Sequence, residues 1–242
     1  MTFLQYIILF LTALGGGALA FYFQKNNAQV LRLVLSFGGA YLLGVVFLHL
    51  LPETYEGGGA SVGFWILGGF LLQICLDQFT QGVEHGHIHA HHGSSWRFAG
   101  GIIAGLSLHA LMEGLPLHSF ATHQGHPHHE LLFGILMHKP PEAFALTLLL
   151  LTSGFERKRV VAVLFGFALM TPLGALLGLW IEQNQFFAPN ITVYIMAAVI
   201  GSFFHIATTI LYENESSAQH KVSWDRLLTI IIGILCASLT MH

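Results

Sequence analysis

Two copies of one motif place a histidine and a glutamate four residues apart inside long apolar segments. The first runs from His109 to Glu113 and the second from His138 to Glu142. Residues four apart lie on the same face of an α-helix, so each motif can present both side chains to one point. Imidazole and carboxylate groups together suit a borderline divalent metal such as Zn²⁺. The two motifs therefore predict a metal site with up to four protein ligands.

The segments that carry the motifs belong to a strongly apolar chain. Apolar residues make up 54% of the 242 residues and charged residues 9%, against roughly 25% charged residues in soluble domains. The mean hydropathy is +0.67. Ionisable side chains at bilayer depth are costly and usually mark an ion pathway. The composition offers no basic face for nucleic acid, and Cys75 and Cys236 lie in apolar stretches where a disulfide is not expected.

Crossing a bilayer takes about 20 apolar residues, and the backbone groups inside it must be satisfied within a helix. Eight stretches meet this requirement, at about residues 3–23, 30–51, 61–80, 98–118, 131–151, 159–181, 190–212 and 224–241. The connections are short, so we expect one all-α transmembrane domain over residues 1–242, with a His-rich loop at about 81–97. Ala18-Leu19-Ala20 resembles a cleavage site, but no basic residue precedes the first stretch, which we expect to be retained.

Basic residues fall in or beside every second connection. Eight of the nine lysines and arginines follow the first, third, fifth and seventh stretches, namely Lys25, Arg32, Arg97, Arg157, Lys158, Arg159, Lys221 and Arg226. Because cytoplasmic loops carry an excess of positive charge, these connections are predicted to be cytoplasmic and both termini extracytoplasmic. The expected location is the plasma (inner) membrane.

This topology brings the two motifs to similar depths. The fourth stretch runs outward and the fifth inward, and a helix rises about 1.5 Å per residue. His109 then lies level with Glu142, and Glu113 lies level with His138. Each histidine is therefore expected to face the glutamate of the other helix. The alternative is that each His–Glu pair is a buried hydrogen bond that only holds helices together.

Prolines interrupt both motif segments. Pro116 follows the first motif, and Pro140 and Pro141 lie within the second. Proline removes a helical hydrogen bond and frees a carbonyl group, and transporter sites often use helices broken in this way. A plain packing kink is the alternative.

These features resemble the ZIP (Zrt/Irt-like) family of divalent-metal transporters. The resemblance rests on the paired motifs, which lie in consecutive stretches of a chain with eight predicted helices. A His-rich loop precedes the fourth stretch. Further matches are His49 to Glu53, Thr171 to Ala175 and Phe204 to Thr208. The resemblance implies a 3+2+3 arrangement with the first three and last three helices as inverted repeats. It also implies a transport site built from both motifs, a homodimer, and movement of one helix bundle against the other.

The chain departs from the family pattern at two positions. Many members carry Asn or Asp directly after each motif histidine, forming a second metal subsite, and here those positions are Ala110 and Lys139. In low dielectric a lysine must lose its proton or pair with an anion, and Glu113 and Glu142 are the available carboxylates. We therefore expect the Lys139 ammonium to occupy the second subsite. The alternative is that Lys139 reaches another helix.

Two further His–acid pairs lie along the predicted path. His49 and Glu53 repeat the motif spacing at the outer end of the second stretch, as an entrance way-station or as an interfacial cap. His205, with Glu213 beyond it, lies toward the cytoplasmic end of the seventh stretch, as an exit relay or as a satisfied core histidine. Asp77 is interpreted as a helix-end charge.

Two His-rich runs flank the membrane segments. They are expected to bind metals loosely, and the alternative is that they are only solvated loops. They are His85, His87, His89, His91 and His92 on the cytoplasmic side, and His123, His126, His128 and His129 on the outer side.

The sequence favours a transporter, not an enzyme, that takes Zn²⁺ into the cytoplasm, with Fe²⁺, Mn²⁺ or Cd²⁺ as further cargo. The alternative is a membrane-embedded His-rich metalloenzyme of the desaturase or hydroxylase type. That class needs many histidines on one face, whereas here the His-rich runs are predicted on opposite sides of the membrane. A metal sensor that does not transport also fits these residues.

Overall fold

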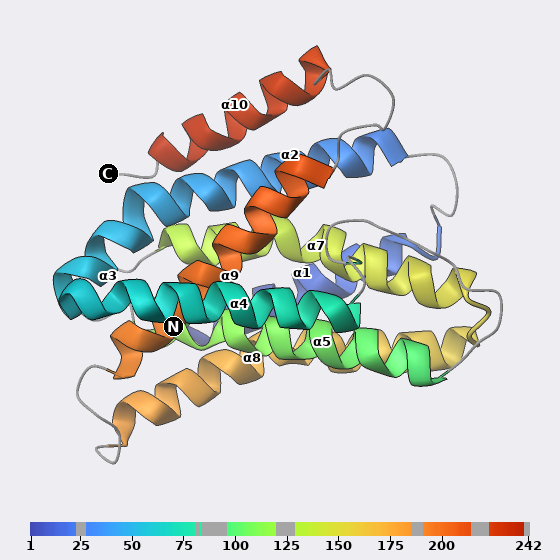
Figure 1. Cartoon of the computed structure of the whole chain (residues 1–242). Coiled ribbons are helices and arrows are strands. Elements are labelled where there is room, and N and C mark those ends of the chain that lie inside the picture. The colour runs from blue at the N-terminus through green and yellow to red at the C-terminus, as the bar shows by residue number, and fades with distance from the viewer. Residues whose placement is uncertain are drawn as a thin grey trace.

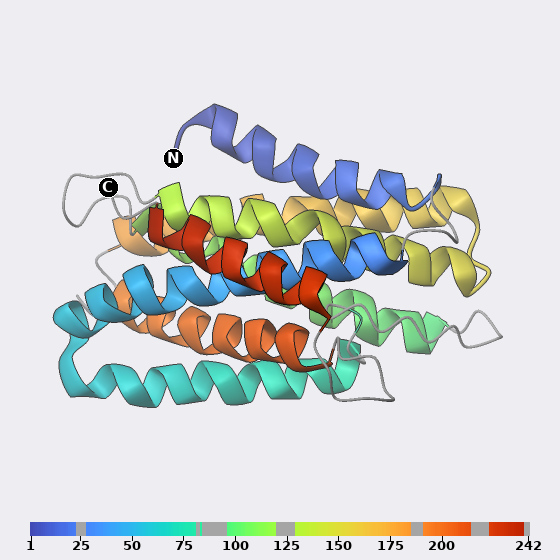
Figure 2. The same cartoon turned by 90° about the horizontal axis from the view of Figure 1, so that it is seen from above.

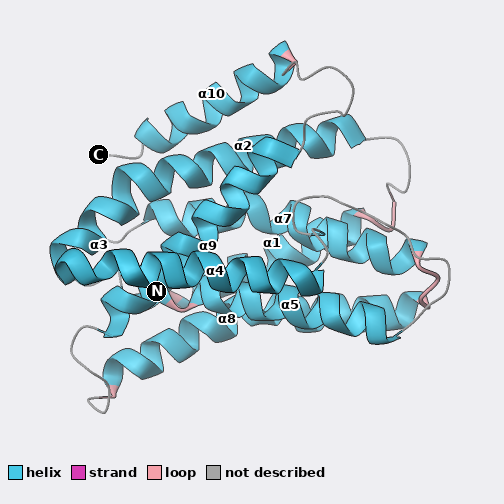
Figure 3. Cartoon of the chain, viewed as in Figure 1, coloured by secondary structure: helices cyan, strands magenta, loops and turns pink. Residues whose placement is uncertain are grey.

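The part of the chain that the structure describes is almost entirely helical, with short loops between some helices (Figure 3). The computed structural model describes residues 1–22, 28–80, 83, 96–119, 129–184, 191–213 and 223–239. Within these ranges there is no β-strand, which confirms the predicted all-α class. Nearly all of the predicted cytoplasmic His-rich loop lies outside the described residues.

Helices account for each of the eight predicted stretches. In chain order they are α1 (Phe3–Leu19), α2 (Ala28–Val45), η1 (Val46–Leu50), α3 (Leu51–Gly58), η2 (Gly59–Ser61), α4 (Val62–Thr80), α5 (Trp96–Gly114), α6 (Pro116–Ser119), α7 (His129–Thr152), α8 (Arg157–Gln183), α9 (Ile191–Glu213) and α10 (Trp224–Leu239). The segment η1 is π-helical and continues α2 into α3 without a break. The largest boundary difference is in the second stretch, which was expected to end at residue 51 and continues through η1 and α3 to Gly58.

Four described stretches are long and apolar enough to cross a membrane. They are Arg32–Thr80, which turns back through α3, and Phe98–His118, Arg157–Gln183 and Ile191–Tyr212. The helix α1 is shorter, α10 has 16 residues, and α7 interrupts its apolar sequence with charged residues. Large apolar side chains such as Phe64 and Trp224 are 80% and 84% exposed on the outside of the molecule. Apolar surface of this extent is expected of a chain that spans a membrane.

The helices form two bundles (Figures 1 and 2). Bundle A consists of α1, α5, α6, α7 and α8, where α1 packs along α7 and α5 along α8. Bundle B consists of α2, α3, α4, α9 and α10, where α4 packs along α9 and α2 along α10. The bundles meet at two places, where α2 contacts α7 and where α4 contacts α5. In Figure 2, α1 begins and α10 ends at the same end of the molecule, which we call the N/C end.

Glycines allow very close helix crossings inside each bundle. In bundle A, a Cβ at Gly174 would lie 2.0 Å from the Leu111 carbonyl oxygen of α5. In bundle B, a Cβ at Gly69 would lie 1.8 Å from the Ala198 carbonyl oxygen of α9. Small residues let membrane helices approach in this way. Among the described glycines, each one whose Cβ would come within 3.0 Å of another helix's backbone meets a helix of its own bundle.

We expect Gly174→Ala to destabilise the protein, and Gly166→Ala in the same helix to leave it as stable or slightly more stable. The methyl group at Gly174 would overlap the Leu111 carbonyl and push α5 from α8, and overpacking of this kind costs about 1–3 kcal/mol. At Gly166 a Cβ meets nothing within 4 Å, and alanine is favoured over glycine in a helix by roughly 0.5–1 kcal/mol. Thermal unfolding of each variant in detergent measures its change in stability. Equal melting temperatures would contradict the tight crossing of α5 and α8.

The apolar core joins the two bundles toward the N/C end. One cluster there takes residues from both bundles, including Leu9 and Leu131 of bundle A and Met196 and Ala237 of bundle B. Toward the opposite end, the described residues form separate clusters. One is built mainly from α5, α7 and α8, and a smaller one from α2 and α9. The bundles therefore share one apolar cluster toward the N/C end, whereas the clusters toward the opposite end lie mainly within one bundle and α4 still packs against α5 there.

Candidate metal site

The first motif lies near the end of α5, with both side chains buried. His109 and Glu113 are each 1% exposed, and His109 Nε2 lies 2.7 Å from Glu113 Oε1. The spacing of four residues places them on one face of the helix, as predicted. Beyond Glu113, Gly114 packs directly on the backbone of α8, which fixes the position of the motif in bundle A.

The second motif lies in the middle of α7, and two prolines lie inside it. Pro140 and Pro141 lack the N–H groups that would otherwise bond the carbonyls of the preceding turn. A Cβ at Gly16 of α1 would lie 2.3 Å from Pro140 Cα, so α1 packs against this part of α7. His138 Nδ1–H donates to the Gly134 carbonyl over 2.8 Å. This bond fixes the ring and leaves Nε2 as the nitrogen that faces the site.

The two motifs converge on one buried point. One ligand atom from each of His109, Glu113, His138 and Glu142 can be chosen so that all four lie within 4.8 Å of one another. We call these residues the four-residue cluster. His138 Nε2 lies 2.5 Å from Glu113 Oε1, so this histidine faces the glutamate of the other helix as expected. His109 instead contacts Glu113 of its own helix, and the expected pairing with Glu142 is replaced by a contact of Glu142 with Lys139.

Lys139 lies inside the site and bridges two carboxylates. Its Nζ donates to Glu142 Oε2 over 2.7 Å and also to Glu113 Oε2. The side chain is 1% exposed, and its Nζ lies 5.4 Å from the centroid of the Phe167 ring. The predicted partners of Lys139 are therefore its observed partners, and its side chain does not point away from the site.

Two buried polar atoms of the cluster have no hydrogen-bond partner among the described residues. They are His109 Nδ1 and Glu142 Oε1. Buried polar atoms are rarely left unsatisfied, and exceptions need an explanation. A nitrogen and an oxygen of this kind are both ligands for a borderline divalent cation. The donor set is therefore compatible with a metal such as Zn²⁺.

Bundle B contributes apolar walls to the site. Phe203 of α9 packs edge-on against His138, with ring centroids 6.1 Å apart. Gly38 of α2 lies beside the same histidine, where a Cβ would be 3.6 Å from His138 Cβ. Four residues around the site are not marked by the sequence, because apolar residues and glycines in a membrane segment carry no individual signal. They are Phe203, Gly38, Gly16 and Phe167.

His49 and Glu53 lie apart from the four-residue cluster. His49 is in the π-helical segment η1, and its Nε2–H donates to the Ala237 carbonyl of α10 over 3.2 Å. Within the described residues, the pair does not belong to a group of three or more metal-ligand side chains. The contact ties η1 to α10 near the N/C end.

His205 has a partner that the sequence did not suggest. It pairs with Asp77 of α4, so Asp77 is more than the helix-end charge that was expected. One turn earlier, Ser202 donates to Gln73 over 2.7 Å, and this buried contact adds a second polar link between α4 and α9. Glu213 ends α9 and His129 begins α7, but the side chains of both lie outside the described residues. The other histidines of the two His-rich runs also lie outside them.

Comparison with known protein families shows which family the chain belongs to. A sequence model described as ZIP zinc transporter matches residues 2–100 and 93–241, which together cover nearly the whole length. The chain belongs to the ZIP zinc transporter family. Proteins of this family are transporters and not enzymes, so the metalloenzyme alternative is not supported.

Characterised relatives agree with the family assignment. ZIP9 of Micropogonias undulatus is 30% identical over 178 residues, 70% of this chain and 56% of the relative. ZIP9-B of Xenopus laevis is 32% identical over 174 residues, 69% of this chain and 56% of the relative. SLC39A7 of Rattus norvegicus is 35% identical over 87 residues, 28% of this chain and 19% of the relative. All three are named zinc transporters, and the matches span about half of their length or less.

Proposed function

We propose that this chain carries Zn²⁺ across a membrane into the cytoplasm through the four-residue cluster. The observation that carries the proposal is the convergence of two histidines and two glutamates, from two helices, at one buried point of an apolar protein. Membership of the ZIP family supports a divalent metal as cargo. Fe²⁺, Mn²⁺ and Cd²⁺ are further cargo of the same class, since sites with nitrogen and oxygen ligands select among metals only weakly.

The protein holds the cargo with two kinds of ligand. The histidines supply neutral nitrogen, and Glu113 supplies the negative charge that offsets the loss of water from the cation. The prolines of α7 and the Gly134 carbonyl set the angle at which His138 enters the site. Phe203 and Phe167 exclude water around these groups, which strengthens each electrostatic contact.

Lys139 takes the position of a second cation in this proposal. Its ammonium lies between Glu113 and Glu142, where the family resemblance places the second metal subsite. One positive charge already partly neutralises both glutamates, so a single Zn²⁺ completes the site. The site is therefore proposed to hold one metal ion.

Eight helices are proposed to cross the membrane, in the 3+2+3 arrangement that the resemblance implies. The helix contacts support the inverted repeat. Exchanging α1 with α8, α2 with α9, α4 with α10 and α5 with α7 turns the α4–α9 contact into the α10–α2 contact. The same exchange turns the α1–α7 contact into the α8–α5 contact.

Aromatic side chains support the placement of the membrane. At the N/C end, Trp65 stacks on Tyr194 with ring centroids 5.3 Å apart. At the opposite end, Tyr22, Trp96 and Trp224 are exposed near the ends of their helices. Trp and Tyr are enriched at both membrane–water interfaces, so the two groups are proposed to mark the two surfaces of the bilayer. The basic residues after α1, α4, α7 and α9 favour a cytoplasmic opposite end and extracytoplasmic termini in the plasma (inner) membrane.

Labelling of single cysteines tests this orientation. In a variant with Cys75 and Cys236 replaced, a cysteine at Thr2 is expected to react with a membrane-impermeant thiol reagent in intact cells. A cysteine at Lys158, between α7 and α8, is expected to react only after the cells are opened. The reverse pattern would show that the termini are cytoplasmic and would reverse the proposed direction of transport.

Transport is proposed to proceed by movement of bundle A against bundle B. Among the described glycines, the crossings in which a Cβ would come within 3.0 Å of another helix's backbone each lie inside a single bundle, so each bundle is proposed to move as a unit. The shared apolar cluster closes the N/C side of the site, and on the other side the contact of α4 with α5 is the one that has to part. The arrangement therefore corresponds to a state closed toward the outside.

The flanking pairs are proposed to serve entry and exit. His49 and Glu53 lie near the N/C end and would receive the metal, and His205 with Glu213 would release it on the cytoplasmic side. The Asp77 contact adds a carboxylate to the exit pair. A homodimer, as in the family resemblance, remains part of the proposal.

Counterflow of radiolabelled zinc in proteoliposomes tests the function directly. Vesicles that contain the purified chain and are loaded with unlabelled Zn²⁺ are expected to accumulate labelled Zn²⁺ faster than vesicles with the same zinc load and no protein. Binding of zinc without accumulation would instead indicate a sensor that does not transport.

A further inference from the structure

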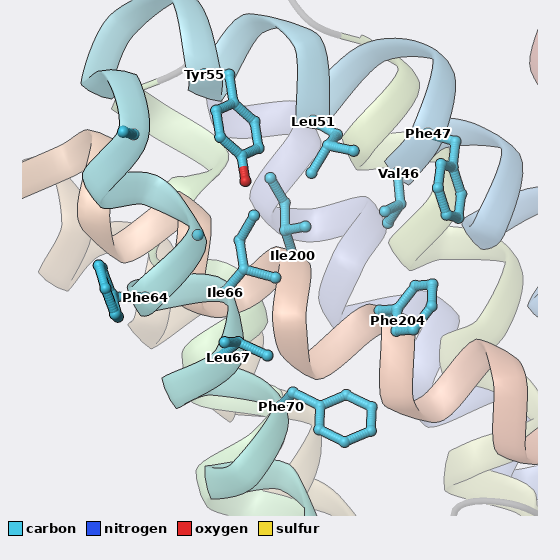
Figure 4. Close-up of a pocket in the computed structure, with 12 residues that line it drawn as sticks. Val46, Phe47, Leu51, Tyr55, Phe64, Ile66, Leu67, Phe70, Ile200 and Phe204 are labelled. Carbon is cyan, nitrogen blue, oxygen red and sulfur yellow. The ribbon is translucent and has the colours of Figure 1, made fainter.

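An apolar groove lies on the outside of bundle B, away from the four-residue cluster (Figure 4). It has a volume of about 640 Å³ and is bordered by η1, α3, α4 and α9. Leu51, Ile66 and Ile200 are directed toward its interior, and Phe47 faces Phe204 across one end. Its wall at Leu67 is 61% exposed, so the groove opens outward from the molecule.

The surroundings of the groove point to a hydrocarbon occupant. The lining residues belong to the stretches Arg32–Thr80 and Ile191–Tyr212, both long and apolar enough to cross a membrane. Bilayer hydrocarbon therefore surrounds the groove, and an unfilled apolar hollow would lose dispersion contacts on its open side. The volume falls in the range of about 300–1,000 Å³ that is typical of sites for a single small ligand.

One polar group marks the end of the groove. Tyr55 is the sole lining residue with a polar side chain, and its hydroxyl points into the groove (Figure 4). It lies on α3, beside the turn into α4 and close to the interfacial pair Trp65 and Tyr194. A tyrosine at this depth presents an apolar ring to the chains and a hydroxyl to the polar boundary. This arrangement suits an amphiphile with one polar end.

We propose that the groove binds one acyl chain of a membrane phospholipid. The ester end lies at the Tyr55 hydroxyl, and the chain runs along α4 toward Phe70 and Phe204. A helix of a second protein copy is the alternative occupant, and the experiment below distinguishes it from an acyl chain.

The bound chain has a structural consequence for the site. Val46 and Ile200 line the groove and also belong to the cluster that joins the two bundles toward the N/C end. A chain packed against them supports that cluster from outside. The lipid therefore favours the closed N/C side, which ties the lipid site to the proposed transport cycle. Lipid binding itself does not depend on transport and is measured separately.

Photolabelling of the reconstituted full-length chain tests the lipid site. The probe is a phosphatidylcholine with a diazirine in its acyl chain, mixed into phosphatidylcholine vesicles, and labelled residues are mapped by mass spectrometry. We expect label to concentrate on residues that line the groove, above the level on the exposed faces of α1 and α8. Tyr55→Phe is expected to weaken labelling roughly fivefold, the worth of one hydrogen bond.

Two glycines of α4 provide a matched pair of variants. Gly63 lines the groove, and a Cβ there would lie 3.1 Å from the Tyr55 hydroxyl, whereas a Cβ at Gly68 meets nothing within 4 Å. Gly63→Leu fills the groove and is expected to reduce groove labelling at least about tenfold. Gly68→Leu adds the same side chain outside the groove and is expected to leave labelling unchanged.

Several outcomes would overturn the proposal. Label spread evenly over the outward faces of α1, α4 and α8 would show only general contact with lipid. Equal labelling of wild type and Gly63→Leu would show that the chain lies elsewhere. Weak groove labelling together with disulfide formation between copies carrying Leu67→Cys would assign the groove to a second copy. Each result is obtained whether or not the protein transports zinc, so failure of the lipid site and failure of the proposed function can be told apart.

Discussion

Glu113→Gln is expected to reduce zinc transport by at least roughly 100-fold, the upper end of the loss seen when the outer partners of metal ligands are removed. Glu113 is the centre of the site, since its carboxylate contacts His109, His138 and Lys139. Glutamine keeps the shape but removes the charge, and it cannot replace the carboxylate as a ligand in a buried site. His138→Ala is expected to have a similar effect, because no other described nitrogen takes its place.

Zinc counterflow in proteoliposomes with matched protein amounts measures this loss. Glu182→Gln is the control, because Glu182 is 30% exposed and contacts His118 at the surface. His87→Ala and His128→Ala, from the redundant His-rich runs, are expected to alter flux only modestly. Flux near the wild-type level in Glu113→Gln, with the protein folded, would remove the four-residue cluster from the transport path.

The helices were predictable because the bilayer leaves the chain little choice. A stretch of about 20 apolar residues can satisfy its backbone only as a helix. Glu113 and His138 were predictable as partners for a related reason. The spacing of each motif fixes a helix face, and the rise per residue fixes a depth, so two side chains at equal depth on neighbouring helices meet.

The rotation of each helix about its axis was not predictable from depth. His109 and Glu142 lie at similar depths in the sequence argument, yet each has another partner in the structure. Lys139 decides this outcome, because its ammonium draws the carboxylates of Glu113 and Glu142 together. A single cation at the crossing therefore changes which acid each histidine meets.

Contacts between distant helices were also beyond the sequence. Asp77 and His205 are 128 residues apart, and they meet because glycines let α4 and α9 cross closely. The pairing requires knowing which helices are neighbours, and apolar segments of similar composition do not specify this. The π-helical turn at η1, which directs His49 toward α10, left no mark in the spacing of apolar residues either.

Lys139→Asp is expected to raise the number of bound zinc ions from one to two per chain. In the wild type, the Lys139 ammonium bridges Glu113 and Glu142 and supplies one positive charge to the two carboxylates. Aspartate at this position removes that charge and adds a third carboxylate. The three acids then need a second divalent cation, and together they supply the oxygen ligands for it.

Metal analysis of the purified protein, equilibrated with excess Zn²⁺ and then desalted, gives the number of zinc ions bound per chain. Without metal, Lys139→Asp is expected to be less stable than the wild type by about 3–5 kcal/mol, the cost of breaking a buried ion pair. Added zinc should restore its melting temperature. Lys139→Met is the matched control, because it removes the charge without adding a ligand, and it should bind one ion. If both variants and the wild type bind one zinc ion each, Lys139 does not occupy the second subsite, and its pairing with the glutamates is only structural.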